Sequence, residues 1–296
     1  MSIMVECFRG GFMNITAIKT KAKHILSNTN SSQYKKIIIM ILIMSRIPNI
    51  YQGTSASLGL LSFVLGILFI CLTHGYVVSG LKVVNGHIQA LNDEDSFVGV
   101  TRFKELIPTY LVSNLFIYGV SILIFIVLTV ICSVFIGTSD YFVDVFSNTV
   151  IDETMITQLL TEAPSFMIMI AVLILILAAS LFVTSALAFA MPYLLEKHNI
   201  TGFKCLKQSI NMMKHHIFDY IKLELSFLGW IILIALIEEL LITYLSFLPF
   251  VLMIVVCISS ILSVQLYYPV YVTSLAIFFE ELAYEHNREG VEVHEI

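Results

Sequence analysis

Apolar residues dominate this chain in long uninterrupted blocks of a kind that soluble proteins do not carry. Four blocks, at residues 47–81, 106–139, 163–195 and 240–279, contain no Asp, Glu, Lys or Arg and are dense in Ile, Leu, Val and Phe. A helix rises about 1.5 Å per residue and a bilayer core is about 30 Å thick, so about 20 apolar residues cross it. Each block is at least that long, which predicts membrane-spanning helices.

The blocks and their interruptions predict an all-α, polytopic membrane protein with six transmembrane helices and amphipathic helices on its inner face. The expected spans are residues 34–51, 56–78, 106–136, 164–194, 223–245 and 250–273, with Pro249 at the last turn because proline cannot continue a helix as a donor. Three parts follow: residues 1–33 as a cytoplasmic N-terminal segment with an amphipathic helix, residues 34–279 as the transmembrane domain, and residues 280–296 as an acidic cytoplasmic tail.

Basic residues orient the spans, because Lys and Arg near span ends are retained in the cytoplasm. With both termini inside, every lysine from Lys19 to Lys222 and also Arg102 lie on the cytoplasmic side, and Arg46 is left over. The loop at residues 137–163 has five acids and no Lys or Arg, as expected of an exterior loop. We expect no cleavable signal peptide, since the first 36 residues lack an apolar core, and the native start stays open between Met1 and Met13.

The composition supports the membrane assignment and limits the kinds of binding partner that we expect. Hydrophobic residues make up 58% of the chain and charged residues 12%, against roughly 25% charged residues in soluble domains. The net charge of -5 says little, because the location of charges matters more than their sum. The expected partner is the lipid bilayer, including anionic lipid; we expect no nucleic acid, and a protein partner stays unknown.

A basic amphipathic helix is predicted between the fourth and fifth spans. Apolar residues recur there at helical spacing and alternate with polar ones. The apolar set is Phe203, Leu206, Ile210, Met213 and Ile217, and the polar set is Lys204, Lys207, Gln208, Asn211 and Lys214. Such a helix either lies among lipid headgroups, with Lys204, Lys207 and Lys214 near anionic lipid, or docks under the bundle as a structural lid. A similar pattern, Ile15, Ile18, Ala22 and Ile25 against three lysines, precedes the first span.

A distinctive run follows this helix. Residues 212–230 read Met-Met-Lys-His-His-Ile-Phe-Asp-Tyr-Ile-Lys-Leu-Glu-Leu-Ser-Phe-Leu-Gly-Trp, ending in the motif Leu225, Ser226, Phe227, Leu228, Gly229 and Trp230. Together with the Tyr-Pro-Val-Tyr-Val-Thr run from Tyr268, it resembles the bacterial integral membrane proteins called domain of unknown function 975. The resemblance implies a bacterial plasma-membrane location and no known reaction.

Away from the span ends, three charged residues fall inside the expected spans. Arg46 lies about 15 Å beyond Lys36, and Glu238 and Glu239 lie about 24 Å beyond Lys222. An intramembrane charge is costly enough to need a partner or water, so we expect Arg46 to pair with Glu238 or Glu239. The alternative is that Arg46 snorkels and both glutamates reach the outer headgroups.

No catalytic cluster, metal-ligand spacing or nucleotide motif stands out, so we expect a non-enzymatic protein without cofactor or metal. The favoured function is a membrane scaffold or envelope-associated factor that contacts lipid through its basic helices. The alternatives are a small transporter or channel, and an immunity protein that uses the exterior loop against a secreted peptide or toxin.

Overall fold

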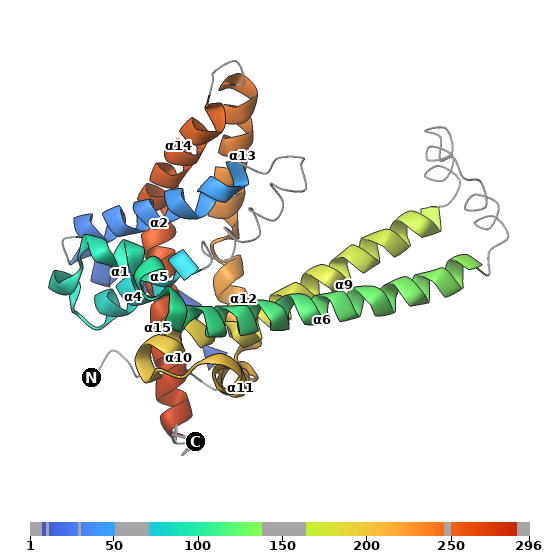
Figure 1. The fold of residues 1–296 in the computed structure, drawn as a ribbon, viewed down its shortest axis with the longest axis horizontal. Helices are drawn as coiled ribbons and strands as arrows, with labels where there is room; N and C mark the ends of the chain where they lie inside the picture. The colour runs from blue at the N-terminus through green and yellow to red at the C-terminus, as the bar shows by residue number, and fades with distance from the viewer. Residues whose placement is uncertain are drawn as a thin grey trace. The chain divides into compact units, whose positions relative to one another are not determined.

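The protein is built almost entirely from helices (Figure 1). A computed structural model describes residues 8–9, 12–28, 31–50, 71–137, 164–245 and 250–288. Apart from an antiparallel pair of two-residue strands, these residues form helices and their connections, which confirms the predicted all-α class. The chain divides into two compact units, Met1–Ser113 with Leu187–Ile296, and Asn114–Ala186.

The first unit holds most of the elements. They are β1 (Phe8–Arg9), β2 (Phe12–Met13), α1 (Ile15–Ser27), α2 (Ser32–Ile50), α4 (His74–Val84), the short helices η2 (Ile88–Ala90), η3 (Asp93–Phe97) and α5 (Val98–Thr101), then α10 (Met191–His198), α11 (Gly202–Met213), α12 (Ile217–Leu225), α13 (Leu228–Leu245), α14 (Val251–Leu266) and α15 (Tyr268–Arg288). Two long helices, α6 (Phe103–Gly137) and α9 (Pro164–Ala188), belong to this unit at one end only.

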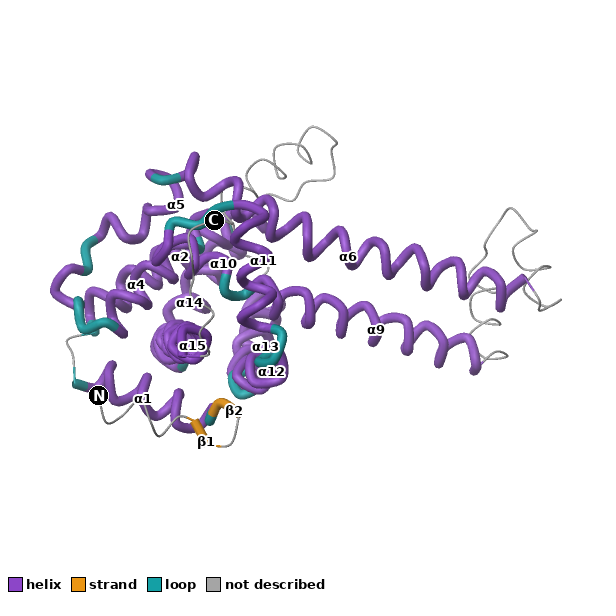
Figure 2. The backbone as a smooth tube through the Cα atoms, turned by 90° about the horizontal axis from the view of Figure 1, so that it is seen from below, coloured by secondary structure: helices purple, strands orange, loops and turns teal. Residues whose placement is uncertain are grey.

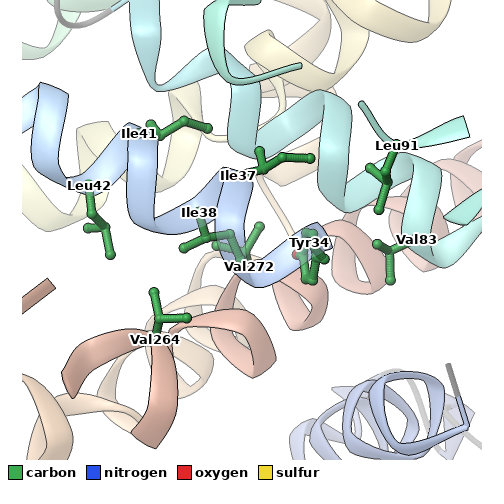
Figure 3. Packing of buried hydrophobic residues seen from close by; sticks show 9 residues of the cluster. All are labelled: Tyr34, Ile37, Ile38, Ile41, Leu42, Val83, Leu91, Val264 and Val272. Atoms are coloured by element: carbon green, nitrogen blue, oxygen red, sulfur yellow. The ribbon is translucent and has the colours of Figure 1, made fainter. Parts of the chain in front are cut away.

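The core of the first unit forms around one face of α2. Tyr34, Ile37, Ile38, Ile41 and Leu42 recur at spacings of three, one, three and one, which places them on a single face of the helix. They pack against residues of α4, α14 and α15, as Figure 3 shows for Val83, Val264 and Val272. The Tyr34 hydroxyl lies 3.2 Å from that of Thr273, so its polar end is also satisfied in the interior.

Helix α15 is the central element of this unit. It packs against α1, α2, α4, α11 and α14, and Figure 2 shows it nearly end-on with α1 on one side and α4 on the other. The predicted apolar face of α1 is confirmed, since Ile18 and Ala22 are fully buried. Residues 280–288, which the sequence prediction assigned to an acidic tail, are the last turns of α15; residues 289–296 lie outside the described residues.

The described part of the chain contains three helical stretches long and apolar enough to cross a membrane: Phe103–Ile131, Ile170–His198 and Leu228–Leu245. A fourth crossing results if α14 and α15, which are bent by 59° at their junction, form one span. These stretches correspond to the third to sixth predicted spans. The predicted sixth span, 250–273, is therefore interrupted at Tyr267 by this bend.

The first two predicted spans are not among these membrane-length stretches. Helix α2 coincides with the first of them but is not among the three stretches, because Lys36 and Arg46 leave an apolar run of only residues 37–44, about 12 Å long. Most of the second span falls in residues 51–70, and the predicted exterior loop falls in residues 138–163; both lie outside the described residues.

The second unit consists, in its described residues, of the later part of α6 and most of α9, which run alongside each other in Figures 1 and 2. Its large apolar side chains point outwards: Leu115, Leu123 and Leu175 are each more than 60% exposed. A helix that is apolar on every side is suited to a lipid environment rather than to water.

A close backbone contact supports the first prediction. A Cβ added to Gly99 in α5 would clash with the backbone carbonyl group of Cys71, whereas a Cβ on Gly119 in α6 would meet open space. We expect Gly99→Ala to lower the free energy of unfolding by about 1–3 kcal/mol, as overpacking does. Gly119→Ala is the matched control and should be neutral or slightly stabilising, because Ala favours the helix. Thermal unfolding in detergent checks this; equal behaviour of the two variants would contradict it.

Candidate functional site

Three carboxylates in the last turns of α15 form ion pairs with other helices of the first unit. Glu281, which is 2% exposed, accepts a hydrogen bond of 2.8 Å from Lys21 of α1. Glu280 pairs with Lys197 of α10. Glu285 lies 3.1 Å from the Nε2 atom of His216, just before α12. The acidic residues that the sequence assigned to a tail therefore fix three other helices.

His216 lies between two carboxylates, one on α15 and one on α12. Its Nε2 faces Glu285, and its Nδ1 lies 3.5 Å from Asp219, whose side chain is 1% exposed. Asp219 also accepts a hydrogen bond from the backbone N–H of Met13, at 3.3 Å. The strand β2, α12 and α15 therefore meet at this histidine.

Helix α11 is docked on the protein by a face that overlaps the predicted one only in part, with Met213 common to both. Cys205, Ser209, Met212 and Met213 are buried, and the Ser209 hydroxyl donates to the Leu187 carbonyl oxygen at 2.6 Å. Phe203, which the sequence prediction placed on the apolar face, is 71% exposed. The prediction was wrong on this point because small and flexible side chains allow the closer approach to the protein, which leaves the bulky ring outside.

The outer face of α11 is basic. Lys204, Lys207 and Lys214 are exposed, and their spacing places them on the same side of the helix as Phe203. Two roles were predicted for this helix: lying among lipid headgroups, or docking under the bundle. The structure shows that one face is docked on the protein, while the three lysines are directed outwards. We call Phe203 with these three lysines the basic face of α11.

The motif Leu225 to Trp230 forms the joint between α12 and α13. Its Ser226 carbonyl oxygen accepts a hydrogen bond of 3.1 Å from Lys19 of α1, and the same ammonium lies 4.4 Å from the centre of the Phe227 ring. Burial lowers the pKa of Lys19, and the charge of Lys23 adds to the effect. Phe227 is buried against the rings of Tyr267 and Tyr271. This motif is therefore where the N-terminal helix is held.

Within the motif, Trp230 marks a helix end. It lies in the first turn of α13 and is 41% exposed, while Leu225, Leu228 and Gly229 are also exposed. Tryptophan is enriched where membrane helices meet the lipid headgroups. The position and exposure of Trp230 fit such a boundary.

The structure brings Arg46 and Glu238 together. The Arg46 guanidinium on α2 donates through Nη1 to the Glu238 carboxylate on α13 and to the Ser259 hydroxyl on α14, the latter at 2.8 Å. All three side chains are partly or fully buried. Glu239, the other predicted partner, lies on the exposed face of α13 instead. Sequence reasoning did not identify Ser259 as a third member of this cluster.

A second polar cluster was missed altogether. His74 of α4 is fully buried; its Nδ1 lies 3.0 Å from the Tyr110 hydroxyl and its Nε2 lies 3.1 Å from the Glu196 carboxylate. Arg102 donates to the same carboxylate at 2.7 Å. The only sequence signal was a histidine within a charge-free block. A histidine and carboxylate pair can carry a proton, but the burial of this ring denies a substrate direct contact with it.

No metal site is found in the part of the chain that the structure describes. No group of three or more His, Cys, Asp or Glu side chains there could hold a metal ion. The arrangement therefore consists of a core clamped by buried ion pairs and a basic outer face.

Comparison with known proteins gives one match. The model of a family described as "Protein of unknown function (DUF975)" matches residues 13–284. No curated protein and no solved structure matches the chain.

The cluster around Arg46 predicts an energetic coupling. We expect the losses of stability in Arg46→Ala and Glu238→Ala to be non-additive, with a coupling free energy of about 0.5–3 kcal/mol, because either substitution leaves the other charge without its partner. Unfolding of the single and double variants in detergent measures it. Glu239→Ala combined with Arg46→Ala is the control and should give additive losses; additivity for Glu238 as well would contradict an energetic role of the pair.

The bridge at His216 predicts that two adjacent histidines differ. His216→Gln removes the buried ring that lies between Asp219 and Glu285, so we expect a loss of about 1–3 kcal/mol in the free energy of unfolding. His215 is exposed, and His215→Gln should change stability by less than about 0.5 kcal/mol. Thermal unfolding and limited proteolysis at the end of α15 check this. Identical protection of α15 in both variants would refute the bridge.

Proposed function

The chain belongs to the family of proteins of unknown function designated DUF975, and we propose that this member is a non-enzymatic membrane scaffold that holds anionic lipid at its cytoplasmic face. The observation that carries the proposal is the basic face of α11. Its three lysines and Phe203 point away from the protein, while the opposite face of the same helix is buried. The helix is thus fixed in place and presents cations together with an aromatic ring.

The proposed topology has six spans with both termini in the cytoplasm of a bacterial cell. Its support is the series of long apolar helices and the sequence rule that basic residues stay inside. In this topology α2 and residues 56–78 supply the first two crossings, and α1, α11 and the end of α15 lie together on the cytoplasmic side. The lysines of α11 then face the anionic leaflet.

The expected strength of the lipid contact follows from the charges. A lysine near an anionic membrane surface contributes about 1 kcal/mol, so three contribute about 3 kcal/mol, or roughly a hundredfold preference for anionic over zwitterionic lipid at low salt. The Phe203 ring adds apolar contact at the level of the headgroups. Salt weakens the charge contribution but not the apolar one.

The test uses the full chain reconstituted in vesicles with spin-labelled phosphatidylglycerol or phosphatidylcholine as probe. We expect wild-type protein to bind the anionic label preferentially. The triple variant Lys204→Gln, Lys207→Gln and Lys214→Gln should lose most of that preference and remain folded. Lys36→Gln is the control, because Lys36 is already paired with Asp93 at 2.7 Å, and it should leave the preference unchanged. An unchanged preference in the triple variant would refute the lipid role.

A further inference from the structure

Helix α13 carries a carboxylate on a face that is otherwise apolar. Glu239 is exposed, and so are Ile232, Leu236 and Leu240 around it. The neighbouring residue Glu238, about 100° further around the helix, points instead to Arg46 on the packed side. Within the described residues, Glu239 has no side-chain hydrogen bond or ion pair.

The position of Glu239 along α13 makes this exposure costly in a membrane. It lies six residues before the end of the helix at Leu245, which is about 9 Å. That distance exceeds the reach of a Glu side chain, so snorkelling does not bring the carboxylate to the headgroups. Tyr244, 74% exposed, lies at the same end of α13, where aromatic side chains mark the boundary of the lipid. Ionisable groups inside this boundary mark functional contacts.

We propose that the face of α13 formed by Ala235, Glu239 and Thr243 is a docking surface for a separate transmembrane helix that carries a Lys or Arg side chain at the depth of Glu239. This inference rests on the membrane location proposed above. The three residues are four apart and share one side of the helix. Ala235 allows a neighbouring backbone to come close, as small residues do at membrane helix interfaces.

Charge complementarity selects a basic partner over a second copy of this chain. A symmetric contact between two copies would bring two Glu239 carboxylates together. Arg46 of a second copy is not available either, because it is engaged by Glu238 and Ser259 of its own chain. A partner with a Lys or Arg neutralises Glu239 where water is excluded.

The experiment uses Trp230 as a built-in donor, since it is the single tryptophan of the chain and lies on α13 about 14 Å from Glu239. The full chain is reconstituted with a dansyl-labelled, leucine-rich transmembrane peptide that carries one Lys at the matching depth. The control peptide has Gln in place of that Lys. We expect energy transfer from Trp230 to be several-fold greater with the Lys peptide. Glu239→Gln should reduce it to the level of the control peptide, and Glu239→Asp should retain it.

Three results would overturn the inference: equal transfer to both peptides, transfer to the Lys peptide that survives Glu239→Gln, or self-association of the full chain that requires Glu239. Quenching of Trp230 by brominated lipid separates the two proposals. If Trp230 is quenched but transfer does not depend on Lys, only the docking surface is refuted. If brominated lipid does not quench Trp230, the membrane location itself is refuted and the docking surface with it.

Discussion

The arrangement of helices in the first unit depends on the ion pairs that the carboxylates at the end of α15 form in partly or fully buried positions. Glu281 is almost completely buried and pairs with Lys21, so the charge of each residue requires the other. Removing either partner would leave an uncompensated charge in the interior, which costs far more than an exposed ion pair contributes. The same helix anchors α10 through Glu280 and the start of α12 through Glu285. Helices distant in sequence are thus held in one arrangement by one acidic segment.

This arrangement explains why the basic residues divide into two groups. Lys19, Lys21 and Lys197 contact other groups of the protein: a carbonyl oxygen and an aromatic ring, or a carboxylate. The lysines on the basic face of α11 point outwards. A count of basic residues assigns both groups to the same side of a membrane, but only the second group is oriented towards a surface outside the protein.

The sequence was sufficient for the helical class, the later membrane-length helices and the apolar face of α1, because each is a local pattern of apolar residues. It also identified Arg46 and Glu238 as partners, since few charged residues lie within the expected spans away from their ends. It placed Phe203 on the wrong face of α11, because helical periodicity groups side chains by type and cannot show which neighbour a helix approaches. The cluster of His74, Tyr110 and Glu196 depends on residues far apart in the chain, and the segment from Glu280 was taken for a tail because its buried partners are equally distant in sequence.

The contacts of β2 and α1 determine an order of events during biosynthesis. Met13, Lys19 and Lys21 find their partners at Asp219, Ser226 and Glu281, which are separated from them by 206, 207 and 260 residues. The ribosome makes α1 well before these partners, because each of them lies more than 200 residues further along the chain. Helix α1 must therefore remain undocked while these segments are being synthesised. Its docking is a late step of assembly that is complete only after α15 has emerged from the ribosome.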